Sequence, residues 1–181
     1  MNVRPLHALK RTAPALLAAW VFLFVFSSPA MPTEFSTVTD GAVDRVVVEK
    51  SKRTLTLLKQ DREVRTYKIA LGRDPVGPKV RQGDNRTPEG VYYVDYKVRN
   101  SVYHRALHLS YPSPEDVERA KALGVPPGGS IMIHGMKKDH LWMGDVQYLF
   151  NWTSGCIALT NQEIEEIWDL ISPWTPVEIR P

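Results

Sequence analysis

Hydrophobic and polar residues alternate in five short stretches of the first half of the chain. These stretches are rich in Val, Ile, Tyr, Leu and Thr, and turn-forming residues separate them. A long loop with several Gly and Pro residues, residues 72–88, lies between the third stretch and the fourth. The pattern predicts strands at Arg45–Glu49, Thr54–Leu58, Val64–Ala70, Gly90–Lys97 and Ala106–Ser110.

Two later segments carry the end signals of helices. The first begins with Ser113 as N-cap, Pro114 in the first turn and a capping box, and Gly124 ends it. The second begins at the capping residue Thr160 and ends before Pro173. Its apolar residues recur at helical spacing, so one face is expected to pack on a sheet: Ile164, Ile167, Trp168 and Ile171.

Three further extended runs surround the second helix. They are Ser130–His134, Cys156–Leu159 and Pro176–Ile179. Seven or eight short strands with two helices predict a mainly β domain, a sandwich or a partly closed barrel, with both helices at its margin.

The first 30 residues have the composition of an export signal. Basic residues precede an apolar run from Ala13 to Phe26, and Ser28-Pro29-Ala30 is a small-x-small cleavage pattern. The run is shorter than the roughly 20 residues that span a bilayer, which favours a cleaved signal peptide. An uncleaved membrane tether is the alternative. We therefore predict a signal peptide at 1–30, a lead-in linker at 31–43, one domain at 44–181, and a periplasmic or cell-envelope location.

The excess positive charge of the chain belongs to this leader. The net charge is +3, and the leader holds three basic residues and no acidic one. The remaining residues balance 20 Lys and Arg against 20 Asp and Glu. The charge therefore does not support a nucleic-acid partner.

The chain has a single cysteine, Cys156, which excludes an internal disulfide and a Cys-rich zinc site. In an oxidising compartment an unpaired cysteine is expected to be buried or used. Strand alternation places Met132 and His134 on one face of their run, and Cys156 and Ala158 on one face of theirs. If the two runs are neighbouring strands, His134 and Cys156 leave the sheet on the same side.

A cysteine beside a histidine is a combination suited to acyl transfer. The imidazole of His134 can lower the pKa of the Cys156 thiol, act as general base, and then return a proton to the leaving amine. A backbone carbonyl such as that of Gly135 could orient the histidine ring. The amides around Ser154–Cys156 are candidate oxyanion donors, and Thr153, Ser154 and Gly155 leave the sulfur accessible.

These residues resemble the signature of the L,D-transpeptidase catalytic domain, the YkuD-type family. The signature consists of His134-Gly135, a gap of somewhat under twenty residues, and Thr153-Ser154-Gly155-Cys156-Ile157. The stretch Gly83-Asp84-Asn85-Arg86-Thr87-Pro88-Glu89-Gly90 is similar to another family segment. The resemblance covers residues 44–181, and the variant around the cysteine looks like a Gram-negative branch without a separate wall-binding module.

The resemblance implies a role for each of these residues. Cys156 matches the nucleophile, His134 the general base, and Gly135 the residue whose carbonyl orients that histidine. Residues 154–156 match the oxyanion region. Two positions differ from many members: Ser154 stands where they have His, and Ala158 stands where they have Arg or Asn.

The implied substrate is the peptidoglycan stem peptide, with roles in cell-wall assembly and cell shape. The thiolate would attack the carbonyl between the third residue, usually diaminopimelate, and D-Ala, and an amine of a second stem or of an envelope lipoprotein would resolve the thioester. No cofactor or metal is implied. Three alternatives stay open: a hydrolytic relative that trims D-Ala or releases a linked lipoprotein, a non-catalytic wall-binding domain, and a zinc peptidase. The zinc site would combine His134 and Cys156 with three further histidines, His104, His108 and His140.

Other residues are expected to have simpler roles. The three histidines just named are expected to be surface or satisfied polar residues, because their spacing fits no tight ligand pattern. The segment between Gly135 and Asn151 is expected to be a loop that could act as a lid. Arg99-Asn100-Ser101 and Tyr103 are candidates for contact with the stem peptide, and four tryptophans are expected in the core or along a groove: Trp142, Trp152, Trp168 and Trp174.

Overall fold

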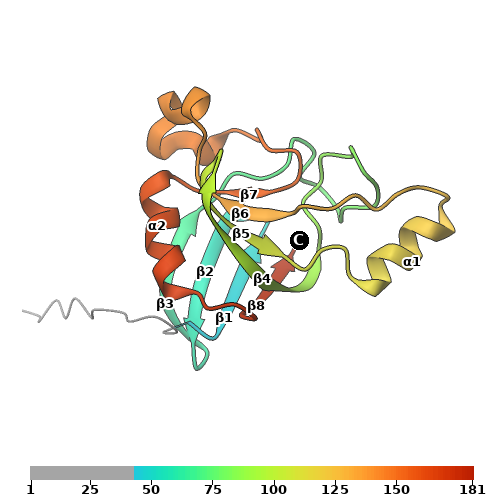
Figure 1. Cartoon of the computed structure of the whole chain (residues 1–181), viewed down its shortest axis with the longest axis horizontal. Helices are drawn as coiled ribbons and strands as arrows, with labels where there is room; N and C mark the ends of the chain where they lie inside the picture. Colours follow the sequence, from blue (N-terminus) through green and yellow to red (C-terminus); the bar gives the residue numbers. More distant parts are fainter. Residues whose placement is uncertain (1–42) are drawn as a thin grey trace, which may run out of the picture. The chain divides into compact units, whose positions relative to one another are not determined.

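A computed structural model describes residues 43–181 (Figure 1). The predicted signal peptide and all but the last residue of the predicted linker lie outside these residues and stay predictions. Within the described part of the chain, no helix is both long and apolar enough to cross a bilayer.

Eight strands form one sheet in the described residues. They are β1 (Arg45–Glu49), β2 (Thr54–Lys59), β3 (Arg62–Lys68), β4 (Gly90–Ser101), β5 (His104–Leu109), β6 (Met132–His134), β7 (Ile157–Ala158) and β8 (Pro176–Arg180). Their order across the sheet is β3-β2-β1-β8-β4-β5-β6-β7. Every predicted strand is present, and the boundaries shift by at most a few residues at each end.

The long strand β4 joins the two halves of the sheet. Its first residues pair with β8, and its later residues pair with β5 across two register shifts. β8 lies between β4 and β1 and runs parallel to β1. The sheet is open in its strand order, but an isolated bridge pairs Ala70, just after β3, with Ala158 of β7. The prediction of a mainly β, partly closed architecture is therefore confirmed.

Both predicted helices form where their caps indicate. In α1 (Pro114–Ala122), Ser113 is the N-cap and Asp116 completes the capping box. In α2 (Asn161–Leu170), Thr160 and Glu163 form the same arrangement. The apolar face of α2 is buried, as its spacing predicts, and consists of Ile164, Ile167 and Trp168 together with the capping residue Ile171.

A third helical segment was not predicted. Residues Lys138–Leu149 form a 3₁₀ segment, η1, that Gly144 interrupts with non-helical backbone angles. Its sequence lacks the amphipathic period of an α-helix, and only Met143 and Gln147 are buried. Figure 1 shows η1 in orange, directly between β6 and β7 along the chain.

Candidate active site

β6 and β7 bring the two candidate catalytic residues together. The strands are parallel neighbours, with Ile133 opposite Ile157 and His134 opposite Ala158. Ile133 and Ile157 are fully buried on the core side, as the alternation predicts. Cys156 directly precedes β7, and it lines one cavity of about 130 Å³ together with His134. The expectation that the two strands are neighbours is therefore confirmed.

The ring of His134 is fixed through its Nδ1 atom. This atom lies 2.7 Å from the carbonyl oxygen of Gly135. Because a carbonyl can only accept a hydrogen bond, Nδ1 must carry the proton. Nε2 of the neutral ring is then the basic nitrogen. The geometry matches the contact that the sequence assigns to Gly135.

Gly135 is held in this position from several sides. Its amide donates to the carbonyl of Arg105 at 3.1 Å, and the next amide, of Met136, donates to Oδ1 of Asn161 at 2.7 Å. A Cβ atom on Gly135 would lie 2.6 Å from that same Oδ1 and 2.9 Å from Ile164. The first turn of α2 therefore demands glycine here and positions the carbonyl that His134 needs.

Aromatic side chains enclose His134, which is only 2% exposed. Tyr103 stacks on the imidazole with 4.3 Å between ring centroids, and Trp152 meets the imidazole edge-on at 5.6 Å. His140 of η1 stacks on Trp152, with 4.6 Å between the ring centroids. His134 lies on the strand face opposite to the core residue Ile133, as predicted. The aromatic rings cover this face, so the imidazole is buried.

Burial shifts the pKa of both candidate catalytic groups in the direction that favours their neutral forms. It raises the pKa of the Cys156 thiol, against the opposing effects of the Met132 backbone and the Lys79 charge. Burial also lowers the pKa of His134 to about 4, although the Gly135 carbonyl favours its charged form. Both shifts favour the neutral form of the group, whereas the sequence suggested a resting thiolate.

The turn before Cys156 is organised by Thr153. The amide of Gly155 donates to Oγ1 of Thr153 at 3.1 Å, and the same hydroxyl donates to the carbonyl of Cys156 at 2.7 Å. The Gly155 amide is therefore already engaged and does not fit the predicted oxyanion role. The amides of Ser154 and Cys156 are the donors that remain.

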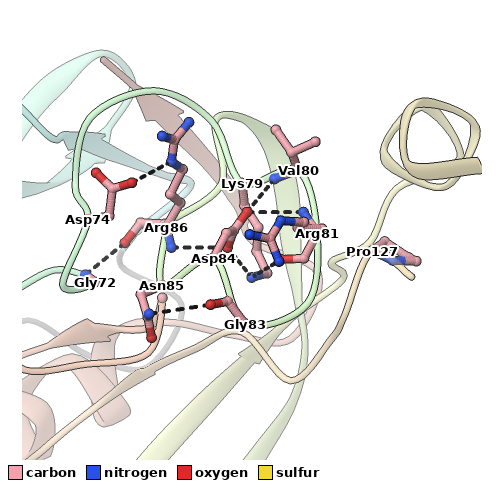
Figure 2. A network of polar contacts seen from close by, with 12 residues as sticks. Gly72, Asp74, Lys79, Val80, Arg81, Gly83, Asp84, Asn85, Arg86 and Pro127 are labelled. Atoms are coloured by element: carbon pink, nitrogen blue, oxygen red, sulfur yellow. Dashed lines mark hydrogen bonds and ion pairs between the residues drawn. The ribbon is translucent and has the colours of Figure 1, made fainter. Parts of the chain in front are cut away.

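The 72–88 loop packs directly beneath this turn. A Cβ atom on Gly155, whose φ is +130°, would lie 2.6 Å from the carbonyl oxygen of Arg86. Within the loop, the carboxylate of Asp84 accepts from Lys79 and from the amides of Val80, Arg81 and Arg86 (Figure 2). The family segment that begins at Gly83 therefore packs against the turn that carries Cys156.

The structure tests the roles predicted for the other histidines and for the tryptophans. His104 contacts Glu165, and His108 contacts Asp95, so both are satisfied polar histidines as expected. Among residues 43–181, no group of three or more His, Cys, Asp or Glu side chains is arranged to hold a metal ion. Trp168 is buried as predicted. Trp142 and Trp174 are 75% and 69% exposed, so neither belongs to the core.

The stem-contact candidates separate into two groups. Tyr103 lines the cavity of Cys156, whereas Arg99, Asn100 and Ser101 line a different cavity of about 670 Å³ beside α2. Arg73 and Lys137 also line the cavity of Cys156, and no local pattern in the sequence marks either of them as a site residue. Arg73 reaches it because residue 72 bridges to residue 153, a pairing that no local pattern could indicate.

Comparisons with known proteins show which family this chain resembles. Residues 43–179 match the family model of the L,D-transpeptidase catalytic domain, YkuD. Over 152 residues, the chain is 30% identical to "Putative L,D-transpeptidase YafK" of Escherichia coli K12; the match covers 81% of this chain and 54% of YafK. The chain thus spans about half the length of this curated relative.

Solved structures share the fold. Pgp2, the helical cell shape determining protein of Campylobacter jejuni, superimposes with a TM-score of 0.58 at 28% identity, covering 78% of this chain and 50% of Pgp2. Bd1075 of Bdellovibrio bacteriovorus has a TM-score of 0.56 at 21% identity, covering 78% of this chain and 51% of Bd1075, and it supports the fold alone. With the family model matching most of its length, this chain belongs to the L,D-transpeptidase catalytic domain (YkuD) family.

Proposed function

We propose that this protein is a cysteine-dependent L,D-transpeptidase that acts on peptidoglycan stem peptides through a thioester acyl-enzyme. The observation that carries the proposal is the shared cavity of Cys156 and His134, with Nδ1 of His134 bonded to the Gly135 carbonyl. This bond leaves Nε2 as the base on the side of the ring away from Gly135. Family membership supplies the substrate class.

The first half-reaction transfers the stem to sulfur. As the donor carbonyl approaches, the Cys156 proton moves to Nε2 of His134, and sulfur attacks the carbonyl carbon between diaminopimelate and D-Ala. The amides of Ser154 and Cys156 stabilise the oxyanion. The carbon–nitrogen bond then breaks, and His134 returns the proton to the D-Ala amine. Because burial favours the neutral form of both groups, we expect this proton transfer to occur only as the substrate binds.

The second half-reaction returns the enzyme to its resting state. An amine of a second stem, or of a lysine in an envelope protein, attacks the thioester carbonyl and gives its proton to His134. The new amide forms as the carbon–sulfur bond breaks, and the sulfur regains a proton. A water acceptor would instead make the enzyme a carboxypeptidase or release a linked lipoprotein. The proposed location is the periplasm or cell envelope, through the N-terminal signal or an N-terminal tether.

Intact-mass measurement after incubation with a carbapenem tests the nucleophile. The wild type is expected to gain one carbapenem mass on Cys156, and Cys156→Ala is expected to gain none. His134→Ala should slow the adduct strongly, because Nε2 no longer accepts the thiol proton. His104→Ala is the matched control, since this histidine is exposed and lies outside the cavity of Cys156. A wild type without any adduct would contradict the proposal.

Mass spectrometry of products from purified tetrapeptide muropeptides then identifies the acceptor. Loss of D-Ala with dimer formation indicates cross-linking, and loss of D-Ala without dimers indicates hydrolysis. Addition of a lysine-containing peptide tests attachment of a protein. Binding of muropeptides without adduct or turnover would identify a non-catalytic wall-binding domain, and loss of turnover with a chelator would favour a zinc peptidase.

A further inference from the structure

The cavity of Cys156 has a positive rim without acidic residues. Arg73 and Lys137 line it, and no Asp or Glu belongs to its lining within the described part of the chain. The Nζ atom of Lys137 lies 3.3 Å from Oδ2 of Asp139, so this carboxylate partly offsets the charge of Lys137. The guanidinium of Arg73 has no ion-pair partner among residues 43–181. Arg73 is therefore the cation of this cavity that is free to meet a ligand.

The two acidic residues of the 72–88 loop are engaged with other groups. Asp74 pairs with Nε of Arg86 at 2.9 Å, and Asp84 is occupied by Lys79 and three backbone amides (Figure 2). The backbone of Arg73 is fixed, because its amide donates to the carbonyl of Thr153 at 3.0 Å. The neighbouring Gly72 also pairs with Thr153, which lies three residues before Cys156. The exposed side chain of Arg73 therefore extends from backbone that is fixed beside the Cys156 turn.

We infer that Arg73 binds a carboxylate of the donor stem peptide and thereby selects stems that carry it. An arginine presents paired N–H groups that match a carboxylate, and such charge-assisted bonds are stronger than neutral ones. The inference rests on the proposed substrate class. Two carboxylates flank the attacked carbonyl: the terminal one of D-Ala and the side-chain one of diaminopimelate. Many family members have Arg or Asn at the position of Ala158. In this chain, Arg73 of the 72–88 loop supplies a cation to the cavity of Cys156 instead.

Binding to a variant without the nucleophile tests the inference apart from turnover. In the Cys156→Ala background, affinity is measured for a synthetic diaminopimelate tetrapeptide, its D-Ala carboxamide and its side-chain carboxamide. Arg73→Gln is expected to weaken the unmodified peptide roughly tenfold, and Arg73→Lys should recover part of the loss. Arg62→Gln is the control with the same charge change, because Arg62 is exposed at the start of β3 and does not line the cavity of Cys156.

The amidated peptides identify the contacted group. Amidation of the carboxylate that Arg73 binds should cost about the same factor as Arg73→Gln, and the two changes together should cost little more. An equal loss for all three peptides, or no loss, would overturn the inference. If the peptides bind and Cys156 forms the carbapenem adduct, that result leaves the proposed function intact. If no peptide binds and no adduct forms, the proposed function fails as well.

Discussion

The 72–88 loop and the 137–150 segment both reach the cavity of Cys156, but they are held in different ways. The loop contributes Arg73, and the segment contributes Lys137 and His140. Neither contains a regular strand or α-helix. Side-chain and backbone hydrogen bonds must therefore replace the ladder that fixes ordinary elements.

Buried charged groups fix the loop, both through contacts inside it and through contacts with Lys50, just after β1. Lys50, which is 4% exposed, donates to the carbonyls of Gly77 and Thr87 and to the carboxylate of Glu89. Lys79 and Asp84 form a second buried pair at 2.7 Å. These bonds tie the loop to the first strand and to itself, so it forms a rigid floor under the nucleophile.

The segment is attached at fewer points. The buried amide of Gln147 donates to the carbonyl of Ala158 and accepts from Nε1 of Trp152. Arg53 donates to Asn151 just beyond its end. Much of its outer surface is apolar and exposed, namely Leu141, Trp142, Val146 and Leu149. We therefore expect changes in the loop to disturb the fold and the nucleophile, and changes in the segment to act locally.

Asp84→Asn is expected to have the largest effect on stability. It leaves the buried ammonium of Lys79 without its counterion, which typically costs about 3–5 kcal/mol in the free energy of unfolding. Urea denaturation measures this loss. Asp74→Asn is the control, because its pair with Arg86 is exposed and should cost about 1 kcal/mol or less. Similar losses for both variants would contradict a buried anchor.

The same carboxylate predicts how the loop responds to acid. Burial disfavours its charge, but the Lys79 ammonium and three backbone amides outweigh this and lower the pKa of Asp84 to about 2. A pKa below the unfolded value stabilises the fold at higher pH. The contribution is complete above about pH 4 and is lost as the pH falls through 2. Acid titration of the wild type and of Asp84→Asn should therefore converge below pH 2; curves that stay parallel would refute this.

Gly155→Ala is expected to have the next largest effect. The new side chain meets the Arg86 carbonyl at 2.6 Å and requires a positive φ, which costs about 1–3 kcal/mol. Because the displaced turn carries Cys156, the carbapenem adduct should form roughly tenfold to a hundredfold more slowly. Gly129→Ala is the control, since its Cβ would meet open space. An unchanged adduct rate would show that loop and turn are not tightly coupled.

Local signals in the sequence account for most of the fold and for the Cys/His pair. Alternation and capping residues locate the strands and both α-helices, because these signals act within a few residues. The bridge from Gly72 to Thr153 and the role of Arg73 depend on contacts between distant parts of the chain. The pKa shifts of His134 and Cys156 arise from burial, which the motif does not reveal. The 3₁₀ segment was missed because its stability comes from Gln147 and Met143 rather than from a periodic face.

Gln147→Leu tests how the 137–150 segment is attached. The change removes the acceptor of Trp152 and one donor to Ala158, whose carbonyl still accepts from Ala70. A loss of about 1–2 kcal/mol is expected, mostly as local opening. Hydrogen exchange should show faster exchange in residues 137–150 and unchanged exchange in the 72–88 loop. Equal acceleration in both regions would mean that the segment supports the whole site.

Trp142→Ser is expected to have the smallest effect, and it probes the outer face of the same segment. Trp142 is 75% exposed and meets Phe150 edge-on at 5.9 Å between ring centroids. Removing an exposed ring with one such contact should change the free energy of unfolding by less than about 0.5 kcal/mol. Urea denaturation and the carbapenem adduct rate should both match the wild type. A loss above about 2 kcal/mol would place this ring in the packing of the segment and would weaken the contrast with the loop.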